Sequence, residues 1–288
     1  MSQSLRLAAL FAAAVAGSAA VARAGDGPVQ DNSFLIEEAY NQEAGVIQHI
    51  GTFARTRSGA WGNSFTEEWP VLGQRHQASV TFTASEPARG KAGIGDLALN
   101  YRLQAIGSGE DRVAFAPRLT VLLPTGDASR GLGAGGSGLQ VNLPVSVALT
   151  SWLVTHVNAG ATYVPSARDV TGSSGTSTTF AAGDSLMFLA HSNFNLLVEW
   201  LYTRTDLSLP GGARRSETLT VNPGVRGAIN FASGLQIVPG LSVPLGVGPS
   251  RGEKAIFLYL SFEHPFRMAG PTEERKTTIE GASSLSSL

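Results

Sequence analysis

Residues 139–150 read LQVNLPVSVALT, and this stretch decides the class of fold. Apolar side chains stand at every odd position from Leu139 to Leu149, and the even positions between them are largely polar. Successive side chains of a β-strand point to opposite faces, so the alternation predicts a strand with one apolar and one polar face. Residues 95–105 and 194–205 repeat the pattern.

The same alternation, strict or weaker, predicts about twelve strands along the chain. They span residues 46–56, 61–70, 77–84, 95–105, 113–123, 139–150, 153–163, 185–190, 194–205, 218–229, 235–245 and 254–262. Most are about 9–12 residues long, whereas strands of soluble proteins have a mode of about 5–6 and a tilted strand that crosses a bilayer needs about 9–11. The predicted fold class is therefore all-β, a single antiparallel transmembrane β-barrel of about 12 strands.

Connections between the later strands alternate in length. Short turns such as Ser151-Trp152 and Ser192-Asn193 alternate with longer loops, which we expect at residues 125–138, 166–183, 206–216 and 246–253. Short turns on one side and long loops on the other are typical of an outer-membrane barrel. A barrel that begins near Val46 then has both ends of its sheet on the short-turn, periplasmic side.

The composition of the 288 residues excludes several classes of protein. A net charge of −1 argues against a nucleic-acid binder, and 43% hydrophobic residues argue against a disordered chain. The chain has no cysteine, which excludes disulfides, thiol catalysis and Cys-ligated metal centres. Its five histidines are scattered, so we expect no metal site and no cofactor.

The chain divides into four parts. Residues 1–24 carry Arg6, an apolar run and an Ala22-Arg23-Ala24 ending, the pattern of a cleavable secretory signal peptide. Residues 25–45 form a lead-in or plug segment, residues 46–266 the barrel, and residues 267–288 a polar tail that we expect to be disordered.

The acidic stretch at residues 31–43 is open to two interpretations. It is either a plug or lid in the lumen, or an ordered periplasmic lead-in to the first strand. We expect a short helix here, capped by Asn32 or Ser33 and stabilised by Glu37 in its first turn.

The polar face of each strand lines the lumen of the predicted barrel. The residues that we expect to line the path of a solute are Asp96, Asn100, Arg102, Arg118, Asn142, His156, Asn158, Glu199, Asn222 and Arg226. This set mixes acids and bases, whereas a pore that selects ions by sign carries a ring of one charge. A strongly ion-selective channel is therefore disfavoured.

Prolines interrupt the pattern, because each removes a ladder hydrogen bond from its strand. The prolines within expected strands are Pro117, Pro144, Pro223 and Pro239. In a strand that crosses a membrane, these prolines predict bulges, or places where water in the lumen bonds the unpaired carbonyl group. The pattern does not explain why three of them stand on the apolar face.

No set of residues in the sequence predicts catalysis. His191-Ser192 has two of the groups of a hydrolase site at a barrel edge, but no third group is identifiable and a surface turn explains both. Residues 131–138 are glycine-rich and lack the Lys-Ser/Thr ending of a phosphate-binding loop. We therefore expect no enzyme activity.

A series of motifs runs through the first half of the chain, from Asp31 to Gly138. They occupy residues 31–43, 45–50, 67–70, 73–77, 95–102 and 122–126. Together these motifs resemble the meta-pathway phenol-degradation (transporter) family of bacterial outer-membrane β-barrel proteins. The resemblance implies a barrel that passes small, often hydrophobic or aromatic molecules, and it implies no catalytic residues.

The sequence therefore favours an outer-membrane channel for passive uptake or efflux of small solutes. Its expected partners are outer-membrane lipids, a small-molecule solute and the barrel-assembly machinery, and not nucleic acid. A non-transport outer-membrane barrel, structural or lipid-modifying, is the alternative, and a secreted soluble β-protein fits less well.

Overall fold

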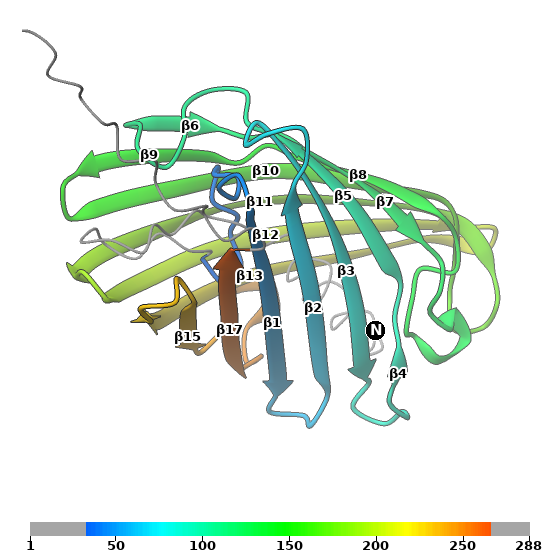
Figure 1. Cartoon of the computed structure of the whole chain (residues 1–288). Coiled ribbons are helices and arrows are strands. Elements are labelled where there is room, and N and C mark those ends of the chain that lie inside the picture. The colour runs from blue at the N-terminus through cyan, green and yellow to red at the C-terminus, as the bar shows by residue number, and fades with distance from the viewer. Residues whose placement is uncertain (1–32, 266–288) are drawn as a thin grey trace, which may run out of the picture.

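The computed structural model describes residues 33–265, which form one closed antiparallel β-barrel of twelve strands (Figure 1). Seven wall strands are uninterrupted: β1 (Val46–Thr56), β2 (Trp61–Pro70), β3 (His76–Glu86), β10 (Leu153–Arg168), β11 (Ser174–His191), β12 (Phe194–Leu209) and β17 (Ala255–Pro265). The other five each consist of two pieces: β4 (Gly93–Ile94) with β5 (Leu97–Leu103), β6 (Val113–Phe115) with β7 (Arg118–Leu123), β8 (Gly138–Asn142) with β9 (Val145–Thr150), β13 (Gly212–Gly227) with β14 (Ile229–Asn230), and β15 (Gln236–Ser242) with β16 (Leu245–Val247). Two short 3-10 turns, η1 (Ala128–Arg130) and η2 (Gly248–Ser250), lie in the loops.

The first and last strands close the barrel. β1 pairs with β17 along its whole length, from Val46 opposite Pro265 to Thr56 opposite Ala255, and with β2 on its other side. Closure leaves no sheet edge, which in lipid would expose unpaired N–H and C=O groups at a cost of several kcal/mol each. The predicted all-β barrel of about twelve strands is confirmed.

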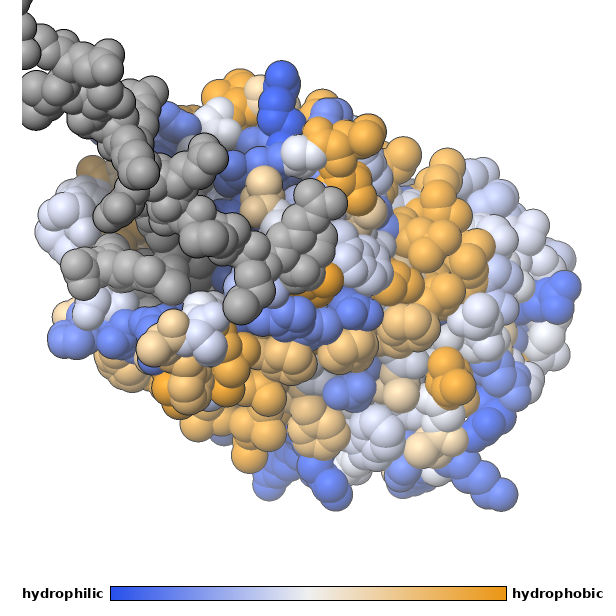
Figure 2. Space-filling view, in the orientation of Figure 1, coloured by the Kyte–Doolittle hydropathy of each residue, from blue (hydrophilic) through white to orange (hydrophobic). Residues whose placement is uncertain are grey.

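Side chains alternate across the wall as the sequence predicts. In β8, Leu139 and Val141 are exposed on the outside, whereas Gln140 and Asn142 are buried inside. Figure 2 shows hydrophobic side chains gathered in a band over the middle of the visible face, with hydrophilic ones toward the ends. This band is the surface that meets lipid, because an outer-membrane barrel presents its apolar positions outward.

Strands β10 to β13 are longer than predicted. They have 16, 18, 16 and 16 residues, and their outer parts replace much of the loops expected at residues 166–183 and 206–216. Backbone pairing continues there, with Asp206 opposite both Thr178 and Arg215. Ser, Thr and charged residues occupy both faces of this outer part, so the alternation that reveals a lipid-facing strand is missing.

A charged carboxylate holds the turn between β10 and β11. Oδ1 of Asp169 accepts hydrogen bonds from the Thr171 hydroxyl (2.6 Å) and from the N–H of Ser173 (3.0 Å). Arg214 on β13 lies 3.3 Å from its Oδ2. The Thr171 hydroxyl is the main cause that holds the pKa of Asp169 below its usual value.

Each of the four prolines that the sequence predicts within strands lies where a wall strand loses its pairing with one neighbour. Pro117 separates β6 from β7, and Pro144 separates β8 from β9. β13 changes partner from β16 to β15 at Pro223, and β15 changes partner from β14 to β13 at Pro239. The sequence pattern did not explain why three of these prolines stand on the apolar face. The structure does, because each proline lies where the ladder to one neighbouring strand is interrupted.

The register is unchanged across these gaps. Phe115 lies opposite Val145 on one side of the first gap, and Arg118 lies opposite Asn142 on the other, so both strands advance by the same number of residues. Of the two predicted alternatives, a bulge is therefore wrong at this gap. The missing N–H group of proline interrupts the ladder without an inserted residue.

The predicted signal peptide at residues 1–24 and the polar tail at residues 267–288 lie outside the described residues. Within residues 33–265, no helix is both long and apolar enough to cross a membrane.

A charge on the apolar belt should destabilise the barrel. Leu260 lies midway along β17 on its outer face and is 46% exposed. We expect Leu260→Arg to lower the free energy of unfolding in phospholipid vesicles by about 2–4 kcal/mol, because an arginine at the bilayer midplane must be solvated in lipid. Leu72, which is 94% exposed in the turn after β2, offers the matched control Leu72→Arg. Equal urea-unfolding free energies for the two variants would contradict the assignment of the lipid-facing surface.

Candidate functional site

Residues 33–42 lie inside the barrel (Figure 1), and every one of them is buried. We call this segment the plug. The helix predicted here is wrong, since none of these residues is helical. Several of its backbone N–H groups donate instead to side chains of the wall, which takes away the partners that a helix would need.

One carboxylate binds the start of the plug. Oε1 of Glu199 on β12 accepts hydrogen bonds from the N–H groups of Phe34 (3.0 Å), Leu35 (2.8 Å) and Ile36 (3.0 Å). Its Oε2 accepts from the side-chain amide of Asn222 on β13, at 2.6 Å. Because one oxygen of Glu199 accepts three consecutive N–H groups, Glu199 is the principal anchor of this end.

Amide side chains bind the middle of the plug as a neighbouring strand would. Asn158 accepts from the N–H of Glu37 and donates to the carbonyl of the same residue, both at 2.8 Å. Gln104 also makes one accepting and one donating contact, but with two different plug residues. It accepts from the N–H of Asn41 (2.9 Å) and donates to the carbonyl of Ala39 (2.8 Å). These contacts satisfy buried backbone groups that water would otherwise have to reach.

The two acids of the plug meet bases of the wall. Glu37 Oε1 lies 2.5 Å from Nη2 of Arg118 on β7. Glu38 Oε1 lies 3.2 Å from Nη1 of Arg226 on β13 and 3.6 Å from Nε2 of His156 on β10. All of these side chains are almost fully buried. The pairing of the two carboxylates with Arg118 and Arg226 offsets the cost of removing these charges from water.

The structure places nine of the ten predicted lumen residues around the plug. Contacts with the plug itself are made by Arg102, Arg118, His156, Asn158, Glu199 and Arg226. Asn100, Asn142 and Asn222 hydrogen-bond to members of that group. The tenth, Asp96, lies apart and accepts from the N–H groups of Gly126 and Ala134 in the loop between β7 and β8.

Several contact residues were not in the predicted set. They include Gln77, Gln104 and Ser146, which accept N–H groups of the plug, and the plug residues themselves. The alternation does place Gln77, Gln104 and Ser146 on the inner face. An inward polar side chain gives the same signal whether it faces water or a peptide segment, so the sequence could not distinguish these anchors.

His191 and Ser192, the two groups considered above for a hydrolase site, are not among the described residues that contact the plug. His191 and Ser192 share an exposed turn, with Ser192 Oγ 3.3 Å from His191 Nδ1. Across residues 33–265 the structure brings together no group of three or more metal-binding side chains.

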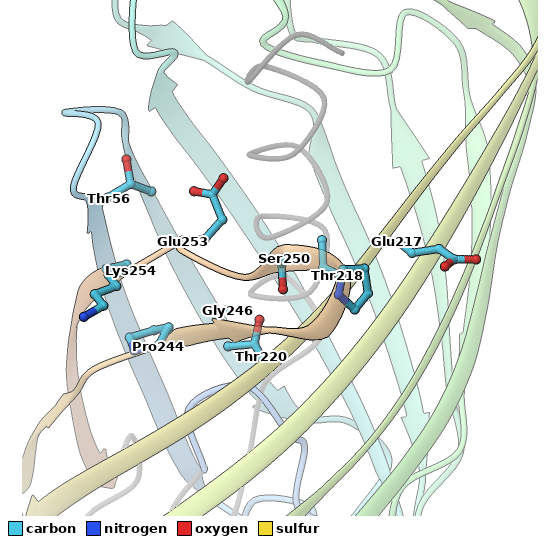
Figure 3. A pocket seen from close by; sticks show the side chains of 11 residues that line it. Thr56, Glu217, Thr218, Thr220, Pro244, Gly246, Ser250, Glu253 and Lys254 are labelled. Atoms are coloured by element: carbon cyan, nitrogen blue, oxygen red, sulfur yellow. The ribbon is translucent and has the colours of Figure 1, made fainter.

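A small recess at the outer end of the barrel is distinct from the plug (Figure 3). Thr218, Thr220 and Pro244 line it beside η2. Ser250 there donates to the carbonyl of Leu219 (2.6 Å) and accepts from the N–H of the same residue (3.0 Å). Because these hydrogen bonds complete the wall, we place the functional site at the plug.

A closed barrel with an apolar outer belt and a polar interior defines a bacterial outer-membrane protein of porin-like architecture. In fold, the chain is similar to an outer-membrane channel from Pseudomonas putida F1, with a TM-score of 0.61 and 14% identity over 77% of this chain and 95% of that one. It is also similar to the NanC porin, with a TM-score of 0.50 and 11% identity over 75% of this chain and 98% of that one. No protein-family model matches the sequence, and no curated protein matches it. The resemblance to the meta-pathway phenol-degradation family therefore stays a prediction.

Removing the Glu199 carboxylate should loosen the start of the plug. Glu199→Ala leaves three buried N–H groups without their acceptor, at about 1–3 kcal/mol for each. We expect faster amide hydrogen exchange at residues 34–36, by about tenfold for each 1.4 kcal/mol lost. Glu199→Gln keeps an accepting oxygen and should have a smaller effect.

The control for this experiment is Glu110→Ala, which removes an exposed carboxylate from the turn between β5 and β6. It should leave exchange at residues 34–36 unchanged. Wild-type exchange rates in Glu199→Ala would show that Glu199 does not anchor the plug.

Proposed function

We propose that the protein is a passive outer-membrane channel for small solutes, and that the plug closes its lumen at rest. One observation carries the proposal: a non-strand segment fills the inside of a barrel whose wall is complete without it. A segment needed for closure of the wall would pair with a strand, whereas residues 33–42 are bound largely through side chains.

The connection between plug and barrel supports a segment that can move as a unit. The chain leaves the lumen through a tight turn in which the N–H of Val46 donates to the carbonyl of Glu43 (3.1 Å). Gly45 in this turn has a φ of +85°, a conformation that glycine adopts without strain. A change of dihedral angles at this turn would swing the plug while β1 keeps its register.

We further propose that the solutes are small and include hydrophobic or aromatic molecules. The mixed charges around the plug disfavour selection of ions by sign. The inner wall beside the plug also carries apolar side chains, Leu197, Phe257 and Tyr259, which a purely aqueous pore would not need. The family resemblance supports the same class of solute. The lipids of the outer membrane would surround the belt, and we propose assembly by the barrel-assembly machinery without enzymatic activity of the barrel.

Deleting the plug should open the lumen. We expect purified protein that lacks residues 33–42 to raise the rate of liposome swelling in small neutral solutes well above that of the intact protein, because the buried segment that occupies the inside of the barrel is then gone. Heat-modifiable migration on a denaturing gel shows that the barrel is still folded. A folded but impermeable deletion protein would contradict the channel, and altered lipids in cells lacking the protein would then favour a lipid-modifying role.

A milder change should increase spontaneous opening. Glu37→Gln leaves the buried Arg118 without its carboxylate partner, and breaking such a pair costs about 3–5 kcal/mol. The closed state bears this cost, so we expect more frequent opening events in planar-bilayer recordings. Glu110→Gln, the same substitution in an exposed turn, should record as wild type.

A further inference from the structure

We infer that the pocket around the Phe34 ring is a binding site for a small benzenoid molecule, which opens the channel by taking the place of that ring. The inference rests on the proposed function, since it names the ligand and the regulation of the same lumen. It follows from three features of the wall where the plug begins.

The first feature is an apolar patch on the inner face of the barrel. Buried apolar side chains come together there from neighbouring strands on one side of the lumen, and they are Ile50, Met187, Leu197, Leu201, Val238, Phe257 and Tyr259. Outer-membrane barrels normally keep the inner face polar. Within the plug, only residues 34–36 cover this patch. The patch therefore has the size of a small apolar group.

The second feature is the shape of the pocket. Gly224 on β13 and Gly240 on β15 face the ring, and a Cβ atom added at either position would lie 2.6 Å or 2.5 Å from a carbon of Phe34. The rings of Phe257 and Tyr259 flank Phe34, with centroids 5.7 Å and 5.5 Å from its own. Bare backbone on one side and aromatic rings on the other leave room for one six-membered ring.

The third feature is a hydrogen-bond acceptor beside the pocket. Oε1 of Glu199 accepts the N–H of Phe34, the residue whose ring fills the pocket. When the plug leaves, Oε1 of this carboxylate loses its three N–H donors, whereas Oε2 keeps the amide of Asn222. A benzenoid molecule that carries a hydroxyl group supplies both a ring for the pocket and a donor for Glu199.

These features make the Phe34 ring and such a molecule competitors for one site. A ligand that binds only the barrel with the plug withdrawn shifts the population toward that state, without any change in the wall. In the closed state the pocket holds the Phe34 ring, and in the open state it holds the ring of the ligand. The fraction of open channels therefore rises with the concentration of the ligand.

A single thiol can report plug withdrawal, because the chain contains no cysteine. Ser33 is 1% exposed and its hydroxyl lies 3.0 Å from that of Ser185, so Ser33→Cys places a small thiol beside Phe34 at a closed position. We expect benzyl alcohol to raise the rate of labelling by a charged maleimide about tenfold in the purified protein. Pentan-1-ol, which has a hydroxyl group and no ring, should leave that rate unchanged.

Two glycine variants in the Ser33→Cys protein test the pocket itself. Gly240→Ala puts a methyl group where the ring lies, so labelling should be fast without ligand and insensitive to benzyl alcohol. Gly51→Ala is the matched control, because its Cβ would meet only the carbonyl oxygen of Leu260 at 3.7 Å, and it should behave as the parent. Heat-modifiable migration checks that each variant is folded.

Three results would overturn the inference: no effect of benzyl alcohol, an equal effect of pentan-1-ol, or a full response to benzyl alcohol in Gly240→Ala. Liposome swelling by the protein that lacks residues 33–42 separates this failure from failure of the channel. If that protein is permeable, the channel stands and only the ligand site falls. If it is folded and impermeable, the proposed function falls as well.

Discussion

The hydrocarbon core of a membrane offers no water to a peptide group, so every backbone donor and acceptor at that depth must find its partner within the protein. The pairing of β1 with β17 meets this requirement at the two ends of the described sheet, because it joins the two strands that would otherwise be edges. The outward apolar belt, the polar interior and the low content of charge, 15% of residues, all follow from this closure. A soluble domain averages about 25% charged residues because its outer surface faces water.

Closure also creates an interior that has to be filled or wetted. In this protein the wall satisfies the plug with the same groups that would otherwise hydrate a pore: Asn158 and Gln104 make the paired donor and acceptor contacts of a neighbouring strand, and Glu199 collects three N–H groups at one oxygen. The ion pairs of Glu37 and Glu38 add charge neutrality. A network of this kind holds a segment firmly while every member is present, and it loses strength quickly when one partner is removed. That property fits the proposed closure of the lumen, which must be both tight and reversible.

Most of the fold could be predicted from the sequence, because lipid on one side and a polar lumen on the other impose alternation on each strand. Where lipid is absent, the signal disappears: the outer part of β11 is polar on both faces, and only its last residues were recognised. The plug lacks any alternation, since Phe34 packs on an apolar patch while Glu37, three residues later, meets Arg118. The residues around it were predicted as a group, because inward polar residues are recognisable by position. Their partners were not predicted, since contacts between residues as distant as Phe34 and Glu199 leave no local pattern.

The proline gaps give the barrel wall an uneven stiffness. Between β6 and β9, and again where β13 meets β15 and β16, the ladder is interrupted while the register is kept. The junction of β1 and β17, which joins the two ends of the sheet, has eleven consecutive residue pairs and no such gap. Thermal fluctuations should therefore bend the wall at the prolines and leave the junction of the chain ends intact. The strand pair that closes the barrel is in this molecule among its most rigid parts.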